Sequence, residues 1–279
     1  MADQSPPQAM PTLVEQIGRA TVRMVAGCSG TVTEIGYATV LLLQSLYFLL
    51  FGRFRNQPVR ASSVVDQMLE IGIRALPIAT TLSLIIGITL AMQGIDLLKT
   101  FGAQSQVVLA VALSVTREFA PLIMGILVAG RSGSALTARI GTMVISQEID
   151  ALRVMGINPV RYLVVPALVA MVTLVPLMTF WADVVGMFGG ALYTQLELGM
   201  SFQAYADKSL EVLTVGHVMH GIAKSAIFAA LIAVTAVVNG FAVSGGAEQV
   251  GRATTRTVVV SIAGIIITDM LFIFVLTRS

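Results

Sequence analysis

Charged residues are scarce in this sequence. Asp, Glu, Lys and Arg together make up 11% of its 279 residues, whereas hydrophobic residues make up 56%. A soluble domain has roughly 25% charged residues, so the composition excludes an ordinary soluble protein. Several apolar runs also reach the roughly 20 residues with which a helix crosses a bilayer. The sequence therefore predicts an all-α polytopic membrane protein.

Cysteine, strand-like alternation and nucleotide-binding motifs are missing or nearly so. The single Cys28 excludes an internal disulfide and disfavours a metal or redox centre. No segment shows the alternation of apolar and polar residues over about ten positions that marks a membrane β-strand. The phosphate-binding pattern GxxxxGK[ST] is also absent. We therefore expect no cofactor in this chain; if ATP drives its function, a partner binds the ATP and its Mg²⁺.

Five apolar segments predict five membrane-spanning helices within residues 61–279. These segments cover residues 75–98, 106–130, 162–196, 215–243 and 257–276. The second helix is expected to continue to about Gly141. Pro166 and Pro176 are candidate kink positions in the third helix.

The first 60 residues are of a different kind. Residues 1–11 are polar and have no basic stretch before an apolar core, which predicts a disordered start rather than a signal peptide. Residues 12–36 place apolar side chains at helical spacing, as in an amphipathic helix at the membrane interface. Residues 37–51 are apolar but too short for a full span. We therefore expect residues 12–60 to form an interfacial, partly inserted helical segment and a loop.

Arginine placement predicts the orientation of the chain. Most arginines near the span ends fall on the side of the N-terminus and of residues 141–161, whereas Lys99, Lys208 and Arg278 fall on the other side. Lys and Arg accumulate in cytoplasmic loops. The N-terminus is thus expected in the cytoplasm and the C-terminus outside it.

Two adjacent ionisable residues, Arg117 and Glu118, lie within an apolar segment. Such groups cost roughly 2.5–3.5 kcal/mol each on insertion scales, so they usually face a cavity or a partner. Neighbouring residues differ by about 100° around a helix and cannot point the same way. One interpretation is an ion pair between helices. The other is that Arg117 meets an anionic headgroup, because guanidinium suits phosphate.

Small residues follow in two rows at helical spacing. These rows are Gly130, Ser134 and Ala138, and Gly133, Thr137 and Gly141. Rows of this kind let helix backbones approach closely, and Gly186 and Gly190 repeat the pattern in the third span. Packing within one subunit is one interpretation. For Gly130, Gly133 and Ser134, contact between two subunits is the other.

A short amphipathic helix is expected at about residues 142–156. Ile145, Ile149, Leu152 and Gly156 line one face, and Gln147, Asp150 and Arg153 lie off it. Such a helix can rest on the membrane or fit a groove on a soluble partner. Periodicity alone does not separate these alternatives.

Further ionisable residues lie within the spans. Asp183 and Asp269 are acidic, and we expect Asp269 to serve helix packing or a polar cavity; proton coupling is the alternative. His217 and His220 begin the fourth span, but no second cluster supports a metal site.

Several motifs in a fixed order resemble the MlaE/YrbE permease family. They are REFAP at 117–121, AGRSGSA at 129–135, GTM at 141–143, QEIDAL at 147–152, MGINP at 155–159 and GRATTRTVV at 251–259. The resemblance extends from about Gln67 to the C-terminus. One departure is Arg139, where the family usually has Glu.

The resemblance implies a permease subunit of an MCE-type ABC phospholipid transporter. It implies a homodimer in the bacterial inner membrane, with cytoplasmic ABC ATPase subunits, an MCE-domain periplasmic protein, often a small STAS-type subunit, and no nucleic acid. Phospholipid would move between inner and outer membranes and maintain outer-membrane lipid asymmetry. The ATPase would dock on residues Ser146, Gln147, Glu148, Asp150, Ala151 and Leu152.

A lipid cavity at the dimer axis completes this hypothesis. We expect the headgroup near Arg117 and Glu118, and Leu90, Leu122 and Asp269 beside the rest of the lipid. The alternative is an ion- or proton-coupled secondary transporter that acts without an ATPase. The five spans and the lack of a visible inverted repeat argue against that alternative. A structural membrane anchor is a third interpretation.

Overall fold

The computed structural model describes residues 36, 39–45, 47 and 61–278. The predicted disordered start at residues 1–11 lies outside the described residues. So does most of the predicted interfacial segment at 12–60, of which the described residues are helical.

Five helical stretches are long and apolar enough to cross a membrane. They are Leu76–Lys99, Gln104–Ile145, Val160–Leu198, Val215–Phe241 and Ala247–Val275. Residues 61–278 contain helices and no strand. The predicted all-α architecture with five spans is therefore confirmed for the described part of the chain.

Each stretch is built from one or more helices. In chain order these are α2 (Ala61–Gly72), α3 (Leu76–Lys99), η2 (Gln104–Gln106), α4 (Val107–Ser114), η3 (Val115–Phe119), α5 (Ala120–Val128), η4 (Ala129–Gly133), α6 (Ser134–Ile145), α7 (Glu148–Val154), η5 (Val160–Val164), α8 (Val165–Leu198), α9 (Phe202–Val212), α10 (Val215–Phe241) and α11 (Ala247–Arg278). Three of the short segments, η3, η4 and η5, are π-helical. The second span thus changes twice from α-helix to π-helix and back, which the sequence did not predict.

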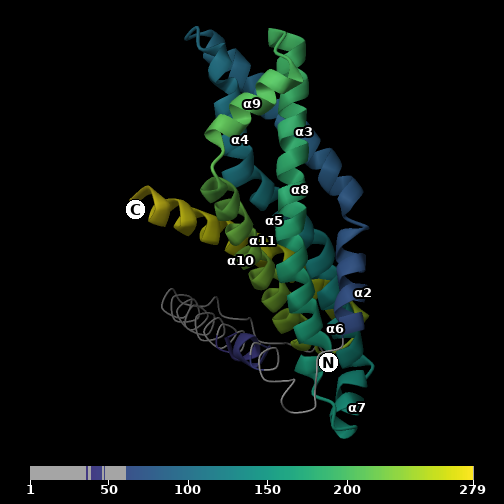
Figure 1. Ribbon diagram of the computed structural model, residues 1–279. Coiled ribbons are helices and arrows are strands. Elements are labelled where there is room, and N and C mark those ends of the chain that lie inside the picture. Colours follow the sequence, from purple (N-terminus) through teal and green to yellow (C-terminus); the bar gives the residue numbers. More distant parts are fainter. Residues whose placement is uncertain (1–35, 37–38, 46, 48–60, 279) are drawn as a thin grey trace, which may run out of the picture.

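Helix α8 runs along most of the height of the molecule and packs against most of the other long helices (Figure 1). It continues through Pro176 as one helix, and Pro166 lies in its first turn. Along its upper part it packs on α3, where a Cβ on Gly87 would overlap the Gly186 carbonyl group and one on Gly189 would overlap the Leu84 oxygen. Small residues at these positions therefore bring the two backbones together.

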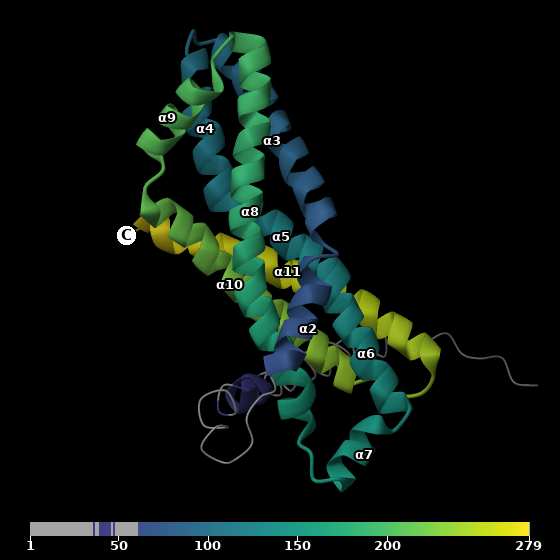
Figure 2. The same cartoon turned by 45° about the vertical axis from the view of Figure 1, so that its right-hand side comes forward.

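Helices α10 and α11 cross the lower part of the bundle (Figure 2). They pack on α6 through the second predicted row of small residues. A Cβ on Gly133 would come within 2.9 Å of Ile232, and one on Gly141 within 2.9 Å of Val243. Between them, the buried Thr137 hydroxyl lies 2.8 Å from that of Thr257. Packing within one subunit therefore explains this row.

The first predicted row behaves differently. Gly130 is exposed, and a Cβ built on it would meet nothing within 4 Å. Ser134 directs its hydroxyl to the Gly130 carbonyl oxygen at 2.6 Å, within its own helix. Close packing at Gly130 within the subunit is thus wrong, because this position is exposed and no described residue packs on it. Contact of Gly130 and Ser134 with a second subunit stays a prediction.

Two predicted boundaries are also wrong. The fifth helix begins at Ala247, ten residues before the expected Thr257, because a polar turn that hydropathy does not mark is still helical. An ion pair of 2.7 Å between Glu248 and Arg252 supports that turn. The expected continuous helix at 142–156 is broken: α6 ends at Ile145 and α7 begins at Glu148.

Candidate functional site

A π-helical turn carries Arg117 and Glu118. Segment η3 interrupts the second span, and single π-helical turns of this kind are frequent at functional sites. Pro121 follows within the next turn and has no N–H to donate to the carbonyl four residues earlier, which is that of Arg117. The backbone therefore leaves an acceptor open inside the membrane-spanning part of the chain.

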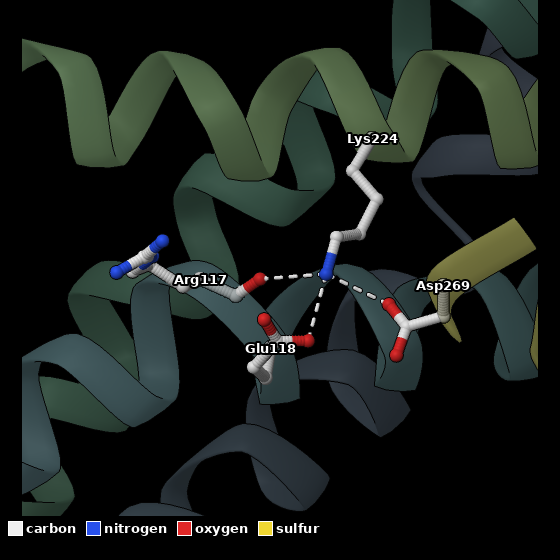
Figure 3. A network of polar contacts seen from close by, with 4 residues as sticks. All are labelled: Arg117, Glu118, Lys224 and Asp269. Carbon is white, nitrogen blue, oxygen red and sulfur yellow. Dashed lines mark hydrogen bonds and ion pairs between the residues drawn. The ribbon is translucent and has the colours of Figure 1, made fainter. Parts of the chain in front are cut away.

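Lys224 of α10 donates to that open acceptor. Its side chain is fully buried, and its Nζ donates to the Arg117 carbonyl oxygen at 3.1 Å and to Glu118 Oε2 at 2.7 Å. The same Nζ lies 2.7 Å from Asp269 Oδ1 on α11 and forms an ion pair with it. The geometry of this contact is not that of a hydrogen bond. Figure 3 shows the three oxygen atoms around the ammonium group. We call these four residues the ion network.

Burial differs among the charges of the ion network. The side chain of Lys224 has 0% of its surface exposed and that of Asp269 12%, whereas Glu118 keeps 32%. An ammonium group taken out of water requires close partners to offset its lost hydration. Two carboxylates and one carbonyl provide them, so the network joins the second, fourth and fifth spans at one point.

The Arg117 guanidinium points away from Lys224 (Figure 3). The side chain is half-buried, and within the described part of the chain none of its nitrogens lies in an ion pair. Its positive charge balances the surplus negative charge of the two carboxylates around Lys224. It is also the member of the network whose side-chain donors form no hydrogen bond with another described residue, so they suit a ligand.

A glycine sets the distance between α10 and the π-helical turn. A Cβ on Gly221 would overlap the Thr116 carbonyl oxygen and come within 3.3 Å of Pro121. Gly221 precedes Lys224 by three residues, so it lies on nearly the same face of α10. The absence of a side chain there allows the ammonium group to reach η3.

The remaining predicted intramembrane groups lie apart or serve packing. His220 stacks edge-on against Phe272 of α11, with ring centroids 5.7 Å apart. Asp183 of α8 is 2% exposed, and neither of its oxygens has a hydrogen-bond partner among the described residues. Leu90 and Leu122 are half-buried against the hydrophobic core. Their predicted contact with lipid stays a prediction.

Helix α7 presents a polar face outward. Glu148, Asp150 and Ala151 are exposed, whereas Ile149 and Leu152 are buried against Leu163. Leu152 thus packs on its own subunit, and its predicted contact with a partner stays a prediction. Ser146 and Gln147 lie in the turn before α7 and not on the helix, because Gln147 adopts a left-handed conformation with φ of 60°.

Comparison with known proteins shows where this chain belongs. The family model described as Permease MlaE matches residues 64–275. The chain is a member of the MlaE permease family. The region that matches this family includes all four residues of the ion network.

Relatives from distant organisms match most of the chain. A probable ABC transporter permease protein of Rickettsia felis is 33% identical over 86% of this chain and 96% of its own length. The intermembrane phospholipid transport system permease protein MlaE of Haemophilus influenzae is 32% identical over 76% of this chain and 83% of its own. The chloroplastic protein TRIGALACTOSYLDIACYLGLYCEROL 1 of Arabidopsis thaliana is 33% identical over 74% of this MlaE-family chain and 59% of its own.

Sequence reasoning found three of the four residues in the ion network and missed the one that joins them. Lys224 carried a usable signal, because a lone lysine in an apolar span requires an acidic partner. The interpretation of an ion pair between helices is confirmed for Glu118, and its partner is Lys224.

Proposed function

We propose that this chain is the membrane-spanning subunit of an ATP-driven phospholipid transporter. The observation that carries the proposal is the match to the Haemophilus influenzae permease, whose name states phospholipid transport, over 83% of that protein's length. The ion network supports it. A charged site of this kind inside a membrane-spanning bundle is expected where a polar ligand passes.

In this proposal the Arg117 guanidinium holds the lipid phosphate. Guanidinium binds phosphate through two parallel hydrogen bonds, and this side chain is half-buried without an ion pair in the described part of the chain. Glu118, the next residue, keeps 32% of its side-chain surface exposed. Leu90 and Leu122 of the first and second spans would contact acyl chains.

Partners complete the transporter. We place two copies of this chain in a bacterial inner membrane, with the N-terminus and α7 in the cytoplasm and the C-terminus in the periplasm. ABC ATPase subunits bind ATP and Mg²⁺, an MCE-domain protein receives lipid in the periplasm, and a STAS-type subunit accompanies them. Transport between the two membranes then maintains outer-membrane lipid asymmetry.

Helix α7 is the proposed contact with the ATPase. Its buried residues, Ile149 and Leu152, hold it to the subunit, and its exposed residues, Glu148, Asp150 and Ala151, face outward. A helix that packs on the bundle with one face and is exposed on the other passes the movement of a bound partner on to the bundle. In this proposal, movement of the ATPase thus reaches the spans that carry the ion network through α7.

The test is purification of the chain together with its proposed ATPase partner from a common expression host. We expect the ATPase subunit and bound phospholipid to co-purify, and Arg117→Ala to lower the amount of bound lipid. Lys208→Ala, which removes an exposed positive charge on α9, is the matched control. Equal amounts of bound phospholipid in the wild type and in Arg117→Ala would show that Arg117 does not hold the lipid.

The docking surface is tested separately with Ala151→Arg. A long charged side chain on the exposed face of α7 should block ATPase binding without lowering the melting temperature of the permease. Val215→Arg, at an exposed position outside α7, controls for an added arginine. An ATPase that binds the Ala151→Arg variant normally would place its contact elsewhere.

One observation favours the ion-coupled alternative, namely that the buried Asp183 has no hydrogen-bond partner in the described part of the chain. That alternative predicts lipid-independent transport by the purified chain in vesicles with an ion gradient and no ATPase. It also predicts loss of that transport in Asp183→Asn. No transport without the ATPase would exclude it.

A further inference from the structure

A pocket with charged residues in its lining lies between α2 and the lower part of the second span. It has a volume of about 140 Å³, which corresponds to roughly four or five water molecules. Its polar lining consists of Gln67, Glu70, Arg131, Ser132 and Arg139. Its apolar lining consists of Ile71, Ala135, Leu136 and Met171. We call it the α2–α6 pocket.

Arg131 gives the first reason to expect a ligand there. Its Nη1 atom is buried and has no hydrogen-bond partner in the described part of the chain. A buried donor on a charged group is costly when it stays unpaired, so such a group calls for an unseen acceptor. The π-helical segment η4 holds Arg131 in place, and the Ser134 hydroxyl donates to its carbonyl oxygen at 2.9 Å.

Arg139 gives the second reason. It lies eight residues after Arg131, and Ala135 lies midway, so the three share one helix face. The two arginines are about 12 Å apart along the helix axis, within reach of each other's side chains across the pocket. Among the described residues, neither arginine forms an ion pair.

The acidic residue in the lining is Glu70 of α2. It approaches from the opposite wall and forms no ion pair with a described residue. The pocket therefore combines two guanidinium groups with one carboxylate. Such a set suits a ligand that carries a phosphate and an ammonium group together.

The α2–α6 pocket is separate from the ion network. Arg131 follows Glu118 by 13 residues, or about 20 Å along the helix. Figure 2 shows α2 beside α6 at the end of the bundle from which α7 extends, whereas α5, α10 and α11 meet higher up. No residue of the ion network lines the pocket.

We propose that the α2–α6 pocket binds the headgroup of a membrane phospholipid that carries a primary ammonium group. Arg131 and Arg139 hold its phosphate, because guanidinium groups match phosphate oxygens in geometry and charge. Glu70 accepts the ammonium group. Ile71, Leu136 and Met171 contact the first methylene groups below the headgroup. This binding does not require that the chain transport the lipid.

The test uses the full-length chain in detergent, depleted of lipid. Short-chain phosphatidylethanolamine, phosphatidylglycerol or inorganic phosphate is added, and the melting temperature is measured at increasing concentration. We expect phosphatidylethanolamine to stabilise the wild type at the lowest concentration. Arg139→Gln should raise the concentration required by roughly tenfold, as expected for a lost charge-assisted hydrogen bond. Arg131→Gln should act in the same way.

Glu70→Gln tests the ammonium contact. It should remove the preference for phosphatidylethanolamine over phosphatidylglycerol and leave the response to phosphatidylglycerol unchanged. Lys208→Gln, an equal loss of charge on α9, should respond as the wild type does. Because Arg139 is exposed, its variant is expected to fold even if that of Arg131 does not.

Two outcomes would overturn the proposal. One is unchanged stabilisation of Arg139→Gln by phosphatidylethanolamine; the other is equal stabilisation of the wild type by inorganic phosphate, which would make the ligand a free anion. Glu118→Gln separates this site from the proposed transport function. It should impair transport in the complete transporter and still respond to phosphatidylethanolamine.

Discussion

Lys224 lies between two carboxylates, and its removal would take away the ammonium group with which both form ion pairs. Breaking a buried ion pair from one side costs about 3–5 kcal/mol. We therefore expect Lys224→Met to lower the melting temperature of the purified chain markedly, even though Met fills most of the same volume. The measurement is thermal unfolding in detergent.

The control for this substitution is Lys208→Met, because Lys208 is exposed on α9. Adding Glu118→Gln to Lys224→Met should restore part of the lost stability, since it removes one unpaired charge. A double variant less stable than Lys224→Met alone would contradict the proposed pairing.

Because of Tyr205, we expect the stability of the folded chain to fall as pH rises above 10. Burial raises the pKa of this α9 phenol from 10.0 to about 12, and its hydroxyl group has no hydrogen-bond partner among the described residues. Between these two pH values the unfolded chain loses the proton and the folded chain keeps it, so stability falls as pH rises. The fall should be smaller in Tyr205→Phe, whose stability below pH 10 should equal or exceed that of the wild type.

The comparison is the difference in melting temperature between wild type and Tyr205→Phe, recorded from pH 9 to 12. Other groups titrate in both proteins and cancel in the difference. A constant difference across this range would show that Tyr205 does not retain its proton in the folded chain.

At the scale of elements, close helix contacts position the charges. Gly221 allows α10 to touch η3, and a Cβ there would overlap the Thr116 carbonyl oxygen. We expect Gly221→Ala to lower the melting temperature and to weaken lipid binding, because it moves Lys224 away from Glu118. Gly216→Ala in the same helix meets only Thr214, at 3.5 Å.

Gly216→Ala is therefore the matched control for this helix. Ala favours a helix over Gly by about 1 kcal/mol, so the control variant should be as stable as the wild type or slightly more stable. Equal melting temperatures for the Gly221 and Gly216 variants would show that α10 can move away from η3 without loss of stability.

Elements were easier to predict than the contacts between them. Hydropathy found all five spans because each contains an apolar run, but it placed the start of α11 ten residues late, where the helix is polar. Charge in an apolar run identified Arg117, Glu118 and Asp269 as candidates. Their connection through Lys224 depends on the packing of α10, and the π-helical turns depend on which carbonyl groups lose their donors. Neither follows from periodicity.

At the scale of the whole molecule, the five spans place the two ends of the bundle on opposite sides of a membrane. We expect Ala151→Cys on α7 to react with a membrane-impermeant maleimide only after the membrane is opened. Lys208→Cys on α9 should react in intact cells whose outer membrane has been made permeable. Both positions are exposed. The background carries Cys28→Ser, which removes the natural thiol.

The reverse labelling pattern would invert the proposed orientation and place α7 outside the cytoplasm. Labelling of both positions in intact cells would contradict a membrane between them. Either result leaves the fold unchanged but removes the proposed ATPase contact.

The two π-helical turns of the second span bear on how this chain can change during evolution. Each turn holds one residue more than an α-helical turn would, so loss of a residue there need not break the helix. Such a deletion would turn the π-helical turn into an α-helical one and leave the residues beyond it facing nearly the same way. A single lost codon at η4 would thus change the position of Arg131 in the α2–α6 pocket while leaving Glu118 beside Lys224, so inheritance could alter the two charged sites one at a time.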